Sequence, residues 1–310
     1  DEIWSWRGSD FVFGGAGNDS IHYGGYIGGG IARLYGNDGD DRFEIVMGPN
    51  PPPTANQYVI VDGGEGDDYV KADVNVELLV INGSNGNDTY ELSGPVTFSF
   101  FGFALNDAGV DTLIWRINES FSLPATIENL VVGNIFGDNN GNALNNTITG
   151  NEFGNVIDSL GGNDTLIGGG GGDRLDGGAD FDTVTYSSAD AAINVNLAGD
   201  VGSGGEAAGD RIFNVERLIG SNFGDSLGGG TIDSTIYGLA GNDTIDGGIG
   251  NNVINGGAGA DNLVGREGND TFWISGAEGL GDTMVGGIGS DTLRVIGTGD
   301  ITLSGFNAGT

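Results

Sequence analysis

Six nine-residue units follow one another without a gap from Gly220 to Trp273: GSNFGDSLG, GGTIDSTIY, GLAGNDTID, GGIGNNVIN, GGAGADNLV and GREGNDTFW. The first six positions of each unit are rich in Gly, Asn and Asp, which tolerate positive φ and form turns. The eighth position is apolar in every unit, which predicts a three-residue strand with one inward side chain. Two units would make one coil of about 18 residues, with a strand on each face and a turn at each edge.

Further copies of the unit occur outside this run. A second block extends from Gly141 to Thr185, and isolated copies begin at Gly14, Gly36, Gly63, Gly83 and Gly286. We therefore predict an all-β fold, a parallel β-roll or β-solenoid whose coils stack about 4.8 Å apart.

The positions of the copies predict six segments along the chain. They are a first repeat block with long insertions on one edge (1–91), an irregular β connecting segment that continues the solenoid (92–140), a second block (141–186), a β connecting segment (187–219), a third block (220–294) and the start of a further, truncated segment (295–310).

The composition narrows the possible functions. The chain has 310 residues, 64 of them glycine, and its 44 acidic and 10 basic residues give a formal net charge of −34. Nucleic acids and anionic membranes bind basic patches, and a membrane span needs a long apolar run, so we expect neither nucleic-acid binding nor membrane insertion. The sequence has no cysteine and one histidine, His22, which we interpret as an ordinary strand residue. The chain therefore lacks the Cys and His residues that a zinc site or nucleophilic catalysis requires, and we expect no enzyme activity.

The units match GGxGxDxUx, where U is a large apolar residue, and resemble the RTX (repeat-in-toxin, haemolysin-type) calcium-binding repeats of secreted bacterial proteins. The resemblance implies that Ca²⁺ lies between two turns on one edge, one coil apart. Its ligands would be the sixth-position side chains of both turns and backbone carbonyls of the glycine-rich positions, hard oxygens that suit this ion. The residues so implied are Asp19, Asp41, Asp68, Asp88, Asp111, Asp164, Asp173, Asp182, Asp225, Asp243, Asp261, Asp270, Asp291 and Asn252, with the backbone at Gly15, Gly17, Gly64, Gly66, Gly169, Gly171 and position 239 (Leu239).

Spacing assigns these residues to edges. In the third block, one edge would carry Asp225, Asp243 and Asp261, and the other Ser234, Asn252 and Asp270. In the second block, the corresponding sets are Asn146, Asp164 and Asp182, and Asn155 and Asp173. The aspartates of the first block are separated by one coil plus an insertion, so we expect them all on one edge. The opposite edge would carry Asp10 and the loops at residues 23–32, 47–57 and 72–77.

Stacked carboxylates explain why calcium would be needed. Two carboxylates about 5 Å apart repel by roughly 0.8 kcal/mol in water, and by several times more at a lower effective dielectric constant. The apolar triplets bury too little surface to offset many such pairs together with the ordering of a glycine-rich chain. We therefore expect several Ca²⁺ ions, and repeat blocks that are largely disordered until calcium binds.

Extracellular modules typically bind calcium at roughly 10⁻⁴–10⁻³ M, which predicts a location outside the cell or at its surface. The resemblance extends this expectation to type I secretion from a Gram-negative bacterium. The start at Asp1 without Met, and the abrupt end at Thr310, indicate a piece of something longer.

Aromatic residues cluster outside the regular repeats. They are Trp4, Trp6, Tyr23, Tyr26, Phe98, Phe100, Phe101, Phe103 and Trp115. We interpret them as a cap or a thicker core, with a carbohydrate- or partner-binding face as the alternative.

Two functions are consistent with the sequence. The first is a structural or adhesive segment of a secreted or cell-surface protein, such as a surface layer, a filament or a large adhesin, whose partners would be further copies of itself or cell-surface polysaccharide. The second is a calcium-folding export module of a longer enzyme or toxin, such as a protease, a lipase or a pore former, whose activity lies outside this chain.

Overall fold

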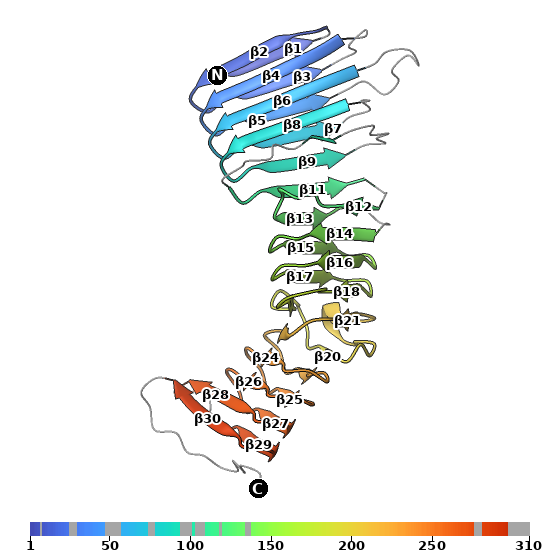
Figure 1. Cartoon of the computed structure of the whole chain (residues 1–310), viewed down its shortest axis with the longest axis vertical. Coiled ribbons are helices and arrows are strands. Elements are labelled where there is room, and N and C mark those ends of the chain that lie inside the picture. Colours follow the sequence, from blue (N-terminus) through green and yellow to red (C-terminus); the bar gives the residue numbers. More distant parts are fainter. Residues whose placement is uncertain are drawn as a thin grey trace. The chain divides into compact units, whose positions relative to one another are not determined.

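The chain is all-β in its computed structural model, which describes residues 1–6, 8–24, 30–46, 57–73, 78–93, 101–102, 109–117, 120–133, 138–275 and 281–296. Contacts divide it into two compact units. The N-terminal unit comprises Asp1–Glu119 and Leu123–Asn134, and the C-terminal unit comprises Ser120–Ser122 and Ile135–Thr310. Each unit is by itself a parallel β-solenoid (Figure 1), which confirms the predicted fold class. The six segments expected from the sequence remain a prediction.

The N-terminal unit consists of two sheets with parallel, in-register strands. One sheet contains β1 (Glu2–Trp6), β3 (Ser20–Gly24), β5 (Arg42–Val46), β7 (Tyr69–Asp73), β9 (Thr89–Ser93), β11 (Thr112–Arg116) and β13 (Asn129–Val132). The other contains β2 (Phe11–Ala16), β4 (Gly30–Asp38), β6 (Gln57–Glu65), β8 (Leu78–Asn85) and β10 (Phe101–Gly102).

The C-terminal unit repeats this plan with shorter strands. One face contains β15 (Thr147–Asn151), β17 (Thr165–Gly169), β19 (Thr183–Thr185), β22 (Arg217–Ile219), β24 (Thr235–Tyr237), β26 (Val253–Asn255), β28 (Thr271–Ser275) and β30 (Thr292–Ile296). A second sheet contains β12 (Phe121–Ser122), β14 (Asp138–Asn142), β16 (Val156–Leu160), β18 (Arg174–Asp176) and β21 (Arg211–Phe213). A third contains β20 (Asn194–Asn196), β23 (Ser226–Gly228), β25 (Thr244–Asp246), β27 (Asn262–Glu267) and β29 (Thr283–Ile288), and a short 3-10 helix, η1 (Gly205–Ala207), precedes β21.

The length of a coil differs between the two units. In the C-terminal unit Ile236 pairs with Ile254, and most equivalent turns lie 18 residues apart, as the nonapeptide predicts, whereas those that span an insertion lie 21, 34 or 37 residues apart. In the N-terminal unit the equivalent turns from Asp19 to Asp111 lie 20 to 27 residues apart, and Glu128 follows Asp111 after 17 residues. The strands nevertheless stay in register, because the extra residues are inserted between strands and leave the pairing of Ile21 with Phe43 and of Phe43 with Val70 intact.

The core is a stack of eighth-position side chains. In the C-terminal unit each three-residue strand buries its central residue, and Ile236, Ile245 and Ile254 are 0% exposed. The predicted three-residue strand is wrong for the N-terminal unit, where strands have four to nine residues apart from the short β10, and for β14 to β17 and β27 to β30 of the C-terminal unit, which have five or six residues. In the N-terminal unit a second inward residue follows the first, as Ile45 follows Phe43, so the core is thicker and longer strands are stabilised.

The expected loops of the first block are also shorter than predicted where the structure describes them. Residues 23–24 belong to β3, residues 30–32 to β4, and residues 72–73 to β7. The remaining loop residues lie outside the described part of the chain, apart from Gln57 at the start of β6. Over the described residues, no helix has the length and apolarity required to cross a bilayer.

Candidate calcium sites in the turns

A ladder of acidic side chains follows one edge of the N-terminal unit. The Asp19 N–H donates to Asp41 Oδ1 at 2.8 Å, and the Asp41 N–H donates to Asp68 Oδ1 at 2.8 Å. The same bond recurs from coil to coil, so each acid receives the N–H of the acid one coil before it. This N-terminal ladder comprises Asp19, Asp41, Asp68, Asp88, Asp111 and Glu128.

The C-terminal unit has equivalent ladders on both edges. The edge before β15 to β30 carries Asn146, Asp164, Asp182, Glu216, Ser234, Asn252, Asp270 and Asp291. The opposite edge carries two ladders, the first with Asn155, Asp173 and Asp210 and the second with Asp225, Asp243, Asp261 and Asp282.

Local backbone structure places every ladder side chain in the same way. The sixth-position residue lies directly before a strand, so its carbonyl enters the sheet while its side chain stays in the turn. The Asp19 carbonyl, for example, accepts the Arg42 N–H at 2.8 Å. The preceding turn needs a left-handed residue, and Gly66, at φ 125°, supplies it before Asp68 without a Cβ clash.

Most ladder carboxylates keep one buried oxygen without a partner. Oδ1 accepts the N–H from the neighbouring coil, but Oδ2 has no hydrogen-bond partner among the described residues in Asp19, Asp41, Asp68, Asp164, Asp173, Asp182, Asp243, Asp261, Asp270 and Asp291. An unpaired buried carboxylate oxygen is costly, so an arrangement that repeats it in coil after coil fits the binding of cations. Asp225 differs, because the Ser221 N–H donates to its Oδ2 at 2.7 Å.

The first glycine of a nine-residue repeat leaves a small space beside that carboxylate oxygen, which we call the cradle. A Cβ atom at Gly36 would lie 2.0 Å from Asp41 Oδ2 and 2.3 Å from the carbonyl oxygen of Gly63, one coil further on. A Cβ atom at Gly238 would likewise meet Asp243 Oδ2 at 2.3 Å and the next coil's glycine carbonyl at 2.4 Å. A carboxylate and a carbonyl oxygen thus share a space that any side chain would fill. Hard oxygens in this arrangement fit Ca²⁺.

Burial sets the electrostatics of the ladders. It raises the pKa to about 7 at Asp68, Asp173 and Asp182, and to about 6 at Asp164, Asp243 and Asp282. For Asp68, the Asp41 N–H opposes the rise in pKa, whereas the charges of Asp88 and Asp41 add to it. Burial likewise raises the pKa of Asp41, Asp210, Asp261 and Asp270. The ladders therefore hold ionised carboxylates at a cost that a bound cation would offset.

The ligand geometry expected from the repeat remains a prediction, and two observations bear on it. Among the described residues, no group of three or more acidic or histidine side chains converges on one metal position, so backbone oxygens would have to complete each site. The carbonyl that shares the cradle with the carboxylate belongs to the first glycine of the next coil, such as Gly63, and ligation by the backbone at the second and fourth positions remains a prediction. Position 239 is Leu239 at φ 80°, so the backbone there adopts the turn conformation without glycine.

Four ladder acids fall outside the recognised repeats. They are Glu128, Asp210, Glu216 and Asp282. Each stands two residues before a buried apolar side chain, as Asp210 stands before Ile212. A triplet of an acid, any residue and an apolar residue in the connecting segments is the sequence signal that identifies them. A fixed separation of 18 residues does not identify Asp210 and Glu216, because their ladder partners lie 37 and 34 residues away.

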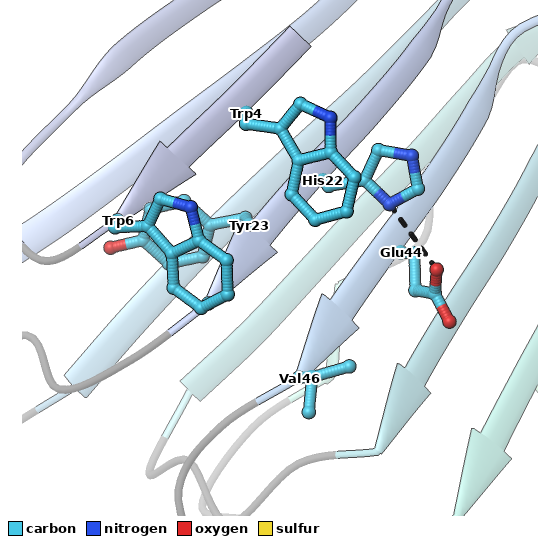
Figure 2. A pocket seen from close by; sticks show the side chains of 7 residues that line it. Trp4, Trp6, His22, Tyr23, Glu44 and Val46 are labelled. Carbon is cyan, nitrogen blue, oxygen red and sulfur yellow. Dashed lines mark ion pairs between the residues drawn. The ribbon is translucent and has the colours of Figure 1, made fainter. Parts of the chain in front are cut away.

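A separate pocket of about 230 Å³ lies on the outer face of β1, β3 and β5 (Figure 2). Trp4 and Trp6 are 55% and 63% exposed, and their rings are within 11° of parallel with centroids 6.1 Å apart. The Trp4 ring stacks on His22 at 4.1 Å, and the Trp6 ring lies against Gly24, where a Cβ atom would be 2.7 Å from it.

Polar groups surround these rings. His22 Nδ1 lies 3.2 Å from Glu44 Oε2, and Trp4 Nε1 donates to Glu2 Oε1 at 3.2 Å.

The aromatic residues noted in the sequence lie in two different environments. Tyr23 and Trp115 belong to the core, at 1% and 3% exposed, whereas the two indoles of β1 face outward. Tyr26, Phe98, Phe100 and Phe103, and the side chain of Phe101, lie outside the described residues.

Parts of the sequence match a known family of repeats. The family model for the RTX calcium-binding nonapeptide repeat (4 copies) matches residues 1–25, 140–174, 149–184, 219–254 and 237–272. Seven solved chains match, and one of them is a hyperactive, Ca²⁺-dependent, β-helical antifreeze protein from an Antarctic bacterium. That chain is 18% identical, the alignment covers 94% of this chain and 81% of the other, and the TM-score is 0.33. No curated protein matches the sequence.

Proposed function

We propose, from the premise that this chain carries RTX calcium-binding repeats, that it is a calcium-folded structural and adhesive segment of a secreted or cell-surface protein. A surface layer, a filament or a large adhesin would contain such a segment. The observation that carries the proposal is the series of buried carboxylate oxygens that recur from coil to coil and have no hydrogen-bond partner in the described part of the chain. Their number and spacing suit a scaffold that several Ca²⁺ ions hold together, rather than a single reaction centre.

The ions would lie in the turns, each between consecutive members of a ladder. At Asp41, for example, the carboxylate Oδ2 and the Gly63 carbonyl would contribute ligands. The N-terminal unit would bind them along one edge, and the C-terminal unit along both. Sites at Asn146, Asn155, Ser234 and Asn252 would be weaker, because a neutral side chain replaces a carboxylate there.

Such a chain suits the outside of a cell. Weak calcium sites stay empty in a cytosol that is poor in calcium and fill at the millimolar concentrations found outside. An unfolded form in the cytosol and a folded form after release would agree with type I secretion from a Gram-negative bacterium.

Circular dichroism in excess calcium and in excess EGTA tests calcium-dependent folding, and an unchanged β signal in EGTA would contradict it. Light scattering and electron microscopy of the same samples test the structural role. Calcium-dependent filaments or sheets support it. A monodisperse monomer in millimolar calcium favours the alternative, in which the chain is the export and folding module of a longer enzyme or toxin.

The pocket on β1, β3 and β5 favours an adhesive role toward neutral cell-surface polysaccharide. Exposed indoles with hydrogen-bonding groups beside them suit a pyranose ring, which is apolar on its faces and polar at its edge. Glu2 and Glu44 already interact with Trp4 and His22, so they are poorly placed to recruit a cation. The net charge of −34 disfavours an anionic polysaccharide.

Affinity electrophoresis in gels that contain neutral glucan, mannan or galactan tests this role. Replacing Trp4 and Trp6 together with alanine should abolish any retardation of the folded chain. Trp273→Ala, on β28 of the other unit, is the matched control and should migrate like the parent chain. Equal retardation of the parent and the double variant would exclude this pocket as the binding site.

A further inference from the structure

Two tyrosines lie where a ladder carboxylate would otherwise keep a free oxygen. Tyr90 Oη donates to Asp88 Oδ2 at 3.2 Å, and Tyr186 Oη donates to Asp210 Oδ2 at 2.7 Å. All four residues are at most 1% exposed, so water does not compete for these oxygens. In both pairs the tyrosine supplies the donor that most ladder carboxylates lack.

The repeat itself provides a comparison for Tyr90. Phe43 and Phe272 occupy the same eighth position and differ from Tyr90 by one hydroxyl group. The carboxylates two residues before them, Asp41 and Asp270, both keep Oδ2 without a hydrogen-bond partner in the described structure. A single oxygen atom on the ring therefore distinguishes a satisfied carboxylate from an open one.

The Tyr90 hydroxyl also occupies the cradle. A Cβ atom at Gly83 would lie 1.6 Å from Asp88 Oδ2 and 2.2 Å from Tyr90 Oη. At Gly36 the second neighbour, at 2.3 Å, is instead the carbonyl oxygen of the next coil. The hydroxyl thus takes the place of an oxygen that would help to coordinate an ion.

We propose that the hydroxyl groups of Tyr90 and Tyr186 replace Ca²⁺ at Asp88 and Asp210, so that these two ladder positions need no ion. The inference rests on the proposed function, because it requires that the open carboxylates bind calcium. Burial, together with the charge of Asp210, raises the pKa of Tyr186 well above its usual value, so its hydroxyl group remains a donor. Each unit thereby has one turn that can form before calcium is abundant, from which ordered coils can extend.

The number of Ca²⁺ ions bound per folded chain tests the proposal. Equilibrium dialysis against calcium, followed by metal analysis, measures this number, and circular dichroism checks that each variant is folded. Tyr90→Phe and Tyr186→Phe should each bind one more ion than the parent. Phe43→Tyr and Phe272→Tyr should each bind one fewer. Tyr69→Phe is the matched control, since the Tyr69 hydroxyl group donates to Glu91 outside the ladders and its loss should leave the count unchanged.

The outcomes separate the two proposals. A parent chain that binds no calcium would refute the proposed function. A parent that binds calcium while all four ladder variants keep its ion count would overturn the role of the tyrosines and leave the proposed function standing. Substitutions in both directions guard against a variant that fails to fold, because the phenylalanine and tyrosine variants change the count with opposite signs.

Discussion

Asp182→Asn separates the hydrogen bond of a ladder carboxylate from its charge. Asparagine keeps the Oδ1 atom that accepts the Asp164 N–H at 2.8 Å, just as Asn252 accepts the Ser234 N–H at 3.0 Å. Burial raises the pKa of Asp182 from 3.8 to about 7. Ionising this carboxylate therefore costs the folded, calcium-free chain on the order of 4 kcal/mol at about pH 8.

The substitution should consequently have opposite effects in the two conditions. In excess chelator at about pH 8 it should stabilise the fold by up to about 4 kcal/mol, because the buried charge is gone. In saturating calcium it should destabilise the fold and lower the ion count, because a ligand is lost. Urea unfolding followed by circular dichroism measures the change in calcium. In chelator, where the parent chain is expected to be largely disordered, the concentration of a stabilising osmolyte needed to restore the β signal measures the change. Asp190→Asn, at an exposed position outside the ladders, is the control for net charge. Destabilisation of similar size with and without calcium would refute the reasoning.

Three further results are expected. Without calcium, thermal stability should fall as the pH rises from about 4 to about 7. Ladder carboxylates whose pKa is raised from 3.8 to about 7 stabilise the fold when protonated and lose that contribution when they ionise. Melting curves in chelator that do not depend on pH would contradict this. Ile254→Ala, at a position that is 0% exposed, should cost about 2–5 kcal/mol in calcium-saturated urea unfolding. Gly238→Ala should remove one ion from the count by filling the cradle at Asp243, whereas Gly161→Ala, where a Cβ atom meets nothing within 4 Å, should leave the count unchanged.

Periodicity could predict the fold because each unit specifies both its turn and its strand. Gly63 and Asp68 lie in the turn and Val70 lies in the core, and the same order of turn residues and inward residue recurs in each copy of the repeat. The sixth-position acids could be assigned to edges because two units make a coil. The lengths of the strands in the N-terminal unit were not predictable, since they depend on a second inward residue, such as Ile45, that the nonapeptide does not specify.

The parts of the site that escaped prediction depend on long insertions or on side-chain direction. Asp210 joins its ladder across 37 residues, so no fixed period reveals it. The contact of Tyr186 with Asp210 likewise joins residues 24 apart. The exposure of Trp4 and Trp6 follows from the alternation of β1, whose register on β3 is set by backbone pairing and not by the repeat.

The ladder bonds have a mechanical consequence within each unit. They run from one coil to the next, in the same direction as the bonds between strands, so a pull along that direction would load the bonds of one junction together rather than one after another. Asp41 and Asp68, for example, join their coils beside the paired strands β5 and β7. An ion seated at such a junction would add its own bonds in parallel with the others. The tensile strength of each solenoid would then follow the calcium concentration around it, and its weakest junction would be the one with the fewest ions.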